Sequence, residues 1–256
     1  MTPGAQLFTV REHCKDLASF AEALKRVADI GYTTVQVSGT CHFEADWLAE
    51  ELRRNGLSCV LTHVKAARIE EDAKHVCDEH KVFGCHNIGL GVIPGGKNIT
   101  FEKYESFVNT FRPLARELRA NGCKLFYHNH CEEFNRFPDG ESCLDKMARD
   151  FSAEELNFTL DTYWAQYGGS DAADLLRRLS GRVECIHLKD MVIDPATWEH
   201  RMAPVGHGNM NFEKILMAAG DAGTRYLLVE QDDCYGEDPF VCLKKSYHYL
   251  TSMGLK

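Results

Sequence analysis

Eight apolar segments recur along the chain at a spacing of about thirty residues, the length of one strand–helix unit in a parallel sheet. They are rich in β-branched and aromatic residues, as buried strands are. Between them, apolar residues recur with helical spacing, as at Leu17, Phe20 and Leu24. The pattern predicts eight strands that alternate with helices. The strand segments are Gln6–Val10, Thr33–Val37, Ser58–Val64, Asn87–Ile93, Lys124–His130, Leu156–Tyr163, Val183–Leu188 and Arg225–Glu230.

The number and size of these units favour one closed barrel over other α/β folds. Eight strand–helix units in 256 residues are the size of a (β/α)8 barrel, the TIM barrel. A doubly wound open sheet is the alternative, but Arg11 and Glu12 stand where its glycine-rich turn would follow the first strand. No linker divides the chain, so we predict a single domain over residues 1–256. The longest stretch without a predicted strand, Met191 to Phe212, is expected to be a functional loop.

Charge and composition limit the classes of partner. The formal net charge of -9 makes nucleic acid an unfavourable partner, because the surface field repels a long anionic polymer. Eleven cysteines without a CxxC pair indicate reduced thiols, and the N-terminus lacks the features of a secretory leader, so we expect a cytoplasmic protein. No apolar run reaches the roughly 18 to 20 residues of a membrane span. The sequence is compatible with a homo-oligomer.

Polar side chains end the last four predicted strands. In chain order they are His128 and His130, Asp161, His187 and Lys189, and Glu230 and Asp232. Alternate residues of a strand share a side, and the carboxyl ends of barrel strands meet at one mouth. Asp161, His187 and Glu230 are therefore expected to converge. Carboxylates with an imidazole suit one divalent ion, Mn²⁺, Mg²⁺, Co²⁺ or Zn²⁺, and indicate a metal-dependent enzyme.

These segments resemble the sugar phosphate isomerase/epimerase superfamily, the xylose isomerase-like barrels. The resemblance covers nearly the whole chain and depends on the order and spacing of several motifs together. It implies a xylose isomerase-like TIM barrel with a carbohydrate substrate. The motifs are Gln6–Arg11, Ile30–Gln36, Tyr127–Phe134, Leu160–Thr162, His187–Asp190, Pro204–Gly208 and Val229–Glu230.

In that superfamily a glutamate, an aspartate, a histidine and a glutamate hold the metal after the fifth to eighth strands. The last three correspond in this chain to Asp161, His187 and Glu230. The first has no clear counterpart, because Tyr127–His130 stands in its place. We predict that Glu133 is the fourth ligand and His128 a base beside it, with the reverse assignment as the alternative. Gln36 is a second departure, since relatives often end strand two with glutamate.

The resemblance implies proton abstraction next to a carbonyl. A divalent ion would acidify the C–H bond, and a carboxylate or imidazole on each face would move the proton. Glu230 and either Glu133 or His128 are the predicted pair. Lys189 is predicted to pair with an anionic substrate oxygen. Predicted substrate contacts, with Phe8 as an apolar wall, are His63, Trp164, His130, Arg201 and His207.

Several functions are consistent with this resemblance. The first is an isomerase or epimerase of a sugar, sugar phosphate or inositol derivative. The alternative is a dehydratase or lyase on a keto-sugar or inosose, because the strand-five motif resembles inosose dehydratases more than ketose 3-epimerases. A remote alternative is an endonuclease IV-type phosphodiesterase, which needs more metal ligands on strands two to four than this chain has. The missing strand-five glutamate favours a metal-free, non-catalytic subunit as the other remote alternative.

Overall fold

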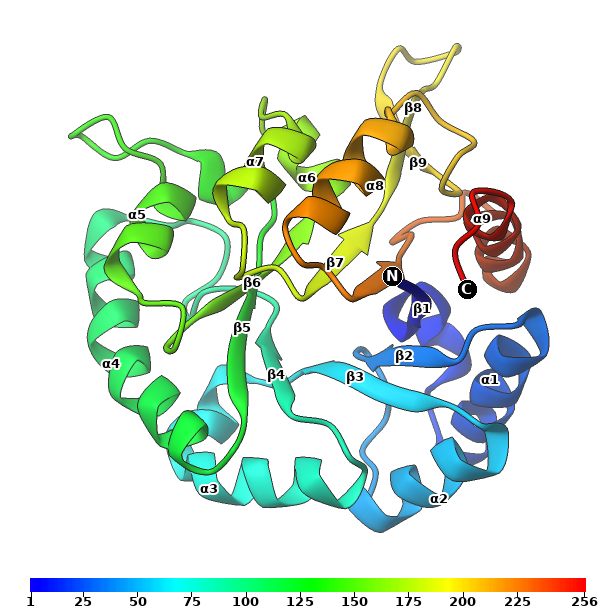
Figure 1. Cartoon of the computed structure of the whole chain (residues 1–256), viewed down its shortest axis with the longest axis horizontal. Coiled ribbons are helices and arrows are strands. Elements are labelled where there is room, and N and C mark those ends of the chain that lie inside the picture. Colours follow the sequence, from blue (N-terminus) through cyan, green and yellow to red (C-terminus); the bar gives the residue numbers. More distant parts are fainter.

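The computed structural model describes residues 1–256 and contains a closed barrel of eight parallel strands (Figure 1). Around the barrel the strands follow the order β1-β10-β7-β6-β5-β4-β3-β2. The predicted (β/α)8 fold is therefore confirmed and the open doubly wound sheet is excluded. The barrel strands are β1 (Thr2–Gln6), β2 (Thr34–Val37), β3 (Ser58–His63), β4 (Asn87–Leu90), β5 (Lys124–His128), β6 (Asn157–Asp161), β7 (Cys185–Leu188) and β10 (Tyr226–Val229).

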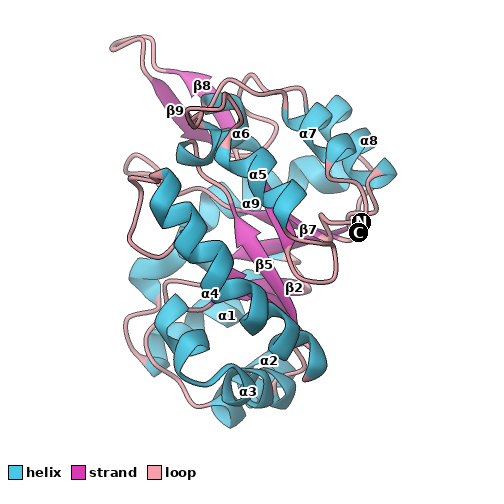
Figure 2. Cartoon of the chain, turned by 90° about the vertical axis from the view of Figure 1, so that its left-hand side faces the viewer, coloured by secondary structure: helices cyan, strands magenta, loops and turns pink.

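Helices surround the barrel and cover its outer face (Figure 2). In α1, Phe20 and Leu24 face the core, and the Asp16 side chain accepts a hydrogen bond from the Ser19 amide at the first turn. None of the helices combines the length and apolar character needed to cross a bilayer. The helices are α1 (Leu17–Ile30), α2 (Ala45–Asn55), α3 (Ala66–Val82), α4 (Phe101–Ala120), α5 (Cys143–Asp150), α6 (Thr162–Tyr167), α7 (Ala172–Arg178), α8 (Phe212–Asp221) and α9 (Pro239–Ser252), with 3-10 turns η1 (Leu7–His13) and η2 (Glu132–Phe134).

A small apolar cluster lies below most of the strand-end side chains inside the barrel. Its members are Val60, Leu61, Phe126, Cys185 and Leu228. Four of them precede His63, His128, His187 and Glu230 by two positions, and residues two apart on a strand share a side. The polar side chains therefore stand on an apolar layer inside the barrel.

The first strand lies earlier in the chain than predicted. The segment Gln6–Val10 forms mostly the 3-10 turn η1, while β1 is Thr2–Gln6 and pairs with β10 and β2. The Pro3-Gly4 pair is typical of turns, so the sequence hides this strand. Glycine is required there by close packing, because a Cβ on Gly4 would lie 2.5 Å from the Thr34 Oγ1 atom.

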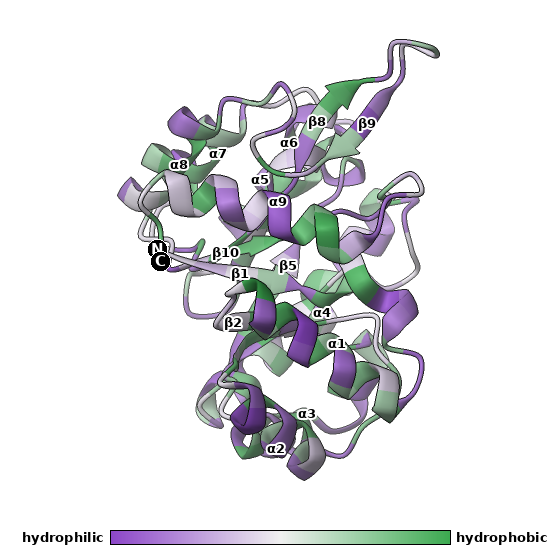
Figure 3. Cartoon of the chain, turned by 90° about the vertical axis from the view of Figure 1, so that its right-hand side faces the viewer, coloured by the Kyte–Doolittle hydropathy of each residue, from purple (hydrophilic) through white to green (hydrophobic).

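The stretch between β7 and α8 was wrongly predicted to lack strands. It contains an antiparallel hairpin, β8 (Asp190–Ile193) and β9 (His200–Ala203), which projects beyond the strand ends (Figures 2 and 3). Its two strands pair with each other and form a sheet separate from the barrel. Asp190, His200 and Arg201 leave these strands without the continuous apolar run that predicted the barrel strands.

The carboxylate of Asp190 holds the chain that returns from this hairpin to α8. It accepts hydrogen bonds from the backbone amides of Met191, Gly206, Gly208 and Met210 at 2.7 to 3.2 Å. A Cβ on Gly208 would lie 2.5 Å from the same carboxylate, so glycine permits the close approach. Asp190 therefore fixes the base of the hairpin against the barrel.

We expect Asp190→Asn to lower the free energy of unfolding by about 2 kcal/mol, since an amide nitrogen would face backbone donors in place of an oxygen. Urea denaturation followed by circular dichroism measures the change. Asp221→Asn, an exposed position without an ion pair, is the matched control and should unfold like the wild type. Equal stability of all three proteins would contradict the anchoring role.

Candidate metal centre

Four buried side chains meet at the carboxyl ends of four adjacent strands. They come from β5, β6, β7 and the residue after β10, and each offers one donor atom within 4.8 Å of the others. Asp161 and His187 are direct neighbours in the register between β6 and β7. The group can hold a metal ion, and its members are His128, Asp161, His187 and Glu230.

The two carboxylate oxygens of Asp161 have different partners. Oδ1 accepts a hydrogen bond from the Trp164 amide and caps α6, at 2.9 Å. Oδ2 faces the cluster, 3.2 Å from Nε2 of His128 and 3.2 Å from Nζ of Lys189. The Asp161 amide in turn donates to the Asn129 side chain at 3.0 Å. Asp161 is thus both a helix cap and a member of the cluster.

The His187 ring is held by a glutamine on the opposite side of the barrel. Nε2 of His187 donates to Oε1 of Gln36 at 2.6 Å, which leaves Nδ1 facing the carboxylates. Nδ1 lies 2.9 Å from Oε2 of Glu230, but the two groups are not aligned for a hydrogen bond. Burial lowers the pKa of His187, but the charge of Glu230 and the contact with Asp161 outweigh burial and raise it above its ordinary value.

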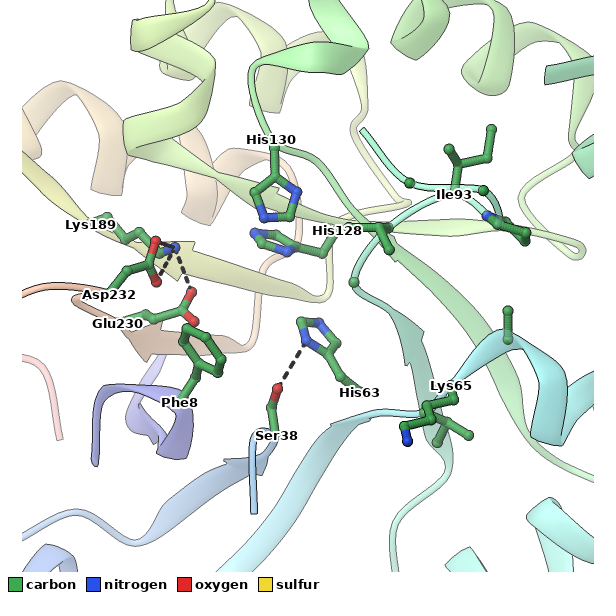
Figure 4. Close-up of a pocket in the computed structure, with 17 residues that line it drawn as sticks. Phe8, Ser38, His63, Lys65, Ile93, His128, His130, Lys189, Glu230 and Asp232 are labelled. Atoms are coloured by element: carbon green, nitrogen blue, oxygen red, sulfur yellow. Dashed lines mark hydrogen bonds and ion pairs between the residues drawn. The ribbon is translucent and has the colours of Figure 1, made fainter. Parts of the chain in front are cut away.

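Lys189 brings a buried ammonium into contact with three carboxylates. Its Nζ lies 3.2 Å from Asp161. It also lies 2.9 Å from Glu230 and 2.9 Å from each oxygen of Asp232 (Figure 4). Burial lowers the pKa of this ammonium, but the three carboxylates outweigh burial and raise it. Burial likewise raises the pKa of Glu230, while Lys189 and His187 hold it well below its usual range.

The donors fit a divalent cation. Nδ1 of His128 and Nδ1 of His187 are buried without a hydrogen-bond partner, which is costly unless another group satisfies them, and Oε2 of Glu230 has the ion pair with Lys189. Three carboxylates surround one ammonium, so two negative charges remain uncompensated when the imidazoles are neutral. Nitrogen and oxygen donors of this kind suit Mn²⁺, Co²⁺ or Zn²⁺.

The structure places Glu133 outside this cluster, contrary to the expectation that it would be the fourth ligand. Its carboxylate accepts hydrogen bonds from the Tyr127 hydroxyl at 2.5 Å and from the His130 amide at 2.7 Å. Glu133 is buried in η2, and both of its oxygens are used in fixing the turn that follows β5. His128, the alternative, stands beside Asp161 instead.

A cavity of about 460 Å³ opens above the cluster. Figure 4 shows Lys189, Asp232, Glu230 and Phe8 on one side of it and His63 on another, with His128 and His130 between them. Nδ1 of His63 pairs with the Ser38 hydroxyl at 3.2 Å, and its Nε2 has no partner. Burial lowers the pKa of His63 to about 3, so the ring is neutral at physiological pH.

Three predicted substrate contacts lie outside the wall of the cavity. Arg201, on the hairpin, pairs with Asp194 at 2.7 Å and lies over the ring of Tyr235, which is in the loop after β10. His207 is exposed on the loop anchored by Asp190. Trp164 lies behind His130, with ring centroids 5.6 Å apart. His63 and His130 line the cavity as expected.

Two polar residues of the centre have no predicted role. Asp232 follows Glu230 by two positions, so strand alternation is the signal that places it at the mouth. Gln36 pairs with a histidine 151 residues away, and no local pattern reveals such a contact. Both hold side chains of the cluster in place, Asp232 through Lys189 and Gln36 through His187.

The sequence model of one protein family, the xylose isomerase-like TIM barrels, matches residues 24–240. The chain belongs to this family.

Two inosose dehydratases are similar to parts of this chain. The protein from Geobacillus kaustophilus is 28% identical over 95 residues, which are 37% of this chain and 30% of that protein. The protein from Clostridium perfringens is 26% identical over 161 residues, 57% of this chain and 52% of that protein. The matches thus span about a third and about half of these relatives.

Solved structures of the family share its fold over the whole barrel. A sugar phosphate isomerase/epimerase from Parabacteroides distasonis superposes with a TM-score of 0.83, at 22% identity, over 98% of this chain and 93% of that one. An L-ribulose 3-epimerase superposes with a TM-score of 0.76, at 15% identity, over 100% of this chain and 95% of that one. Isomerase, epimerase and dehydratase names thus occur among its relatives.

The buried carboxylates predict how stability depends on pH in this xylose isomerase-like barrel. Burial raises the pKa of Asp161, but Lys189 and His128 hold it well below its ordinary value. A carboxyl of this kind stabilises the fold above its unfolded-state pKa of about 4, and the stabilisation is lost as the pH falls. In urea and EDTA, we expect the free energy of unfolding to fall as the pH drops below about 5 and to keep falling below pH 4, and to fall less steeply in Asp161→Asn.

The control for this measurement is Glu71→Gln, an exposed carboxyl without an ion pair. It should follow the pH dependence of the wild type. An Asp161→Asn profile as steep as that of the wild type would show that the ion cluster contributes no pH-dependent stability.

Proposed function

We propose that the protein is a divalent-metal-dependent isomerase or epimerase that moves a proton next to a carbonyl of a sugar. The observation that carries this proposal is the buried group of His128, Asp161, His187 and Glu230, in which two imidazole nitrogens lack a hydrogen-bond partner and of which His128 and Glu230 line the cavity. Membership of the xylose isomerase-like family and its epimerase and dehydratase relatives support it.

The proposed metal ligands are His128, Asp161, His187 and Glu230, with Gln36 holding the His187 ring. When bound, a divalent ion would polarise the substrate carbonyl and acidify the neighbouring C–H bond. Glu230 is a carboxylate at the wall of the cavity and is the proposed proton acceptor. Glu133, whose carboxylate is engaged by Tyr127 and His130, is not proposed as a second proton carrier.

Side chains around the cavity are proposed to bind the substrate. The ammonium of Lys189 can donate a hydrogen bond to a developing oxygen anion. His63 and His130 offer neutral imidazoles from the facing wall, because burial lowers the pKa of each ring. Phe8 gives an apolar surface for the carbon face of a sugar ring.

A dehydratase or lyase acting on a keto-sugar or inosose is the second candidate. The partial similarity to two inosose dehydratases favours it. Dehydration begins with the same proton removal and differs in the later loss of a β-hydroxyl, so the same residues would serve its first step. The structure gathers one metal-binding group, whereas an endonuclease IV-type site needs three metals, and we do not propose that activity.

We expect the purified protein to bind about one Mn²⁺ per chain. Asp161→Ala and His187→Ala should lose this binding because each removes a donor. Glu133→Gln should bind Mn²⁺ like the wild type, since its carboxylate is occupied by Tyr127 and His130. Isothermal titration calorimetry with Mn²⁺ measures the wild type, these three variants and His128→Ala. Loss of binding in Glu133→Gln together with retention in His128→Ala would assign Glu133 as the ligand.

Proton abstraction is tested with solvent deuterium. With Mn²⁺ in D₂O, we expect deuterium to enter at least one member of a panel of ketoses, keto-sugars and inososes. Glu230→Gln should reduce the rate by about 10² to 10⁴, the usual effect of removing a general base. Mass spectrometry detects the exchange, and product analysis separates epimerisation from dehydration. A panel without exchange in the Mn²⁺-loaded wild type would overturn both candidate activities.

A further inference from the structure

The ammonium of Lys189 contacts the same carboxylate atoms that face the proposed metal position. It lies 3.2 Å from Oδ2 of Asp161, the oxygen that also faces His128 and His187. It lies 2.9 Å from Oε2 of Glu230, the oxygen that faces Nδ1 of His187. A monovalent cation of the protein itself therefore stands at the two oxygens that a divalent ion would need.

Two cations cannot share these oxygens without cost. Like charges a few ångströms apart repel strongly in a buried site, where screening by water and salt is weak. An ammonium also uses oxygen lone pairs that a metal ion would take. Lys189 would therefore weaken metal binding if Asp161 and Glu230 were its only partners.

Asp232 provides the third partner and lies on the cavity side of the ammonium. Both of its oxygens accept hydrogen bonds from Nζ of Lys189, each at 2.9 Å. Its side chain is 25% exposed, whereas those of Asp161 and Glu230 are 0% and 4% exposed. Asp232 can therefore hold the ammonium without contributing an oxygen to the four-residue cluster.

We propose that Asp232 is a positioning residue that holds Lys189 on the cavity side and so leaves Asp161 and Glu230 available to a divalent ion. The inference builds on the metal site of the proposed function. It adds that the affinity for metal is set by competition with an internal cation. In the metal-bound enzyme, Lys189 would keep Asp232 as its counterion while its remaining N–H faces the substrate.

The test is a double-mutant cycle in which Mn²⁺ affinity is measured by isothermal titration calorimetry. Asp232→Asn in the wild-type background should weaken Mn²⁺ binding by about tenfold, as loss of a supporting residue around a metal typically does. In the Lys189→Met background, Asp232→Asn should have little further effect, since the competing ammonium is gone. If Lys189→Met does not fold by circular dichroism, Lys189→Gln replaces it in the cycle.

Asp233→Asn is the matched control for simple loss of charge. Asp233 is the next residue, is exposed and contacts the Tyr235 amide rather than Lys189, so its variant should bind Mn²⁺ like the wild type. Equal weakening by Asp232→Asn in both backgrounds would overturn the positioning role and indicate only a long-range charge effect. Unchanged binding in Asp232→Asn would overturn it as well. A wild type that binds no Mn²⁺ would overturn the proposed metal site and this inference together.

Discussion

The ammonium of Lys189 is enclosed by the carboxylates of Asp161, Glu230 and Asp232 at the end of the barrel. Without this ammonium, three negative charges would be buried close together, and burial alone would protonate some of them. With it, the carboxylates stay ionised and keep two units of charge for a divalent cation. The arrangement therefore stabilises the buried carboxylates and, in the proposed metal site, would also limit how strongly a metal ion binds.

The barrel is what brings these groups together. Closure makes β5, β6, β7 and β10 adjacent, and parallel register places Asp161 beside His187. The apolar layer two residues below fixes the depth at which the polar side chains stand. Gln36, from the other side of the barrel, orients the His187 ring. The site is thus a product of strand register rather than of loop conformation.

The predictions from sequence succeeded where a strand is a continuous apolar run and failed where turn-type or polar residues interrupt it. Seven of the eight strands lie within the predicted segments because buried parallel strands are continuous apolar runs. The strand Thr2–Gln6 was missed because Pro3 and Gly4 resemble a turn, although close packing against Thr34 requires glycine. The β8–β9 hairpin was missed because Asp190, His200 and Arg201 leave its strands without a continuous apolar run.

The sequence alone determined the barrel and the residues at its strand ends, because hydrophobic periodicity and alternation are local properties of the chain. It also indicated Asp161, His187 and Glu230 as a group, since their strands follow one another in order. Only the tertiary structure decided that the carboxylate of Glu133 is taken by Tyr127 and His130. The same holds for the partners of Lys189, because ion pairing in a buried site depends on distances between strands that no local pattern encodes.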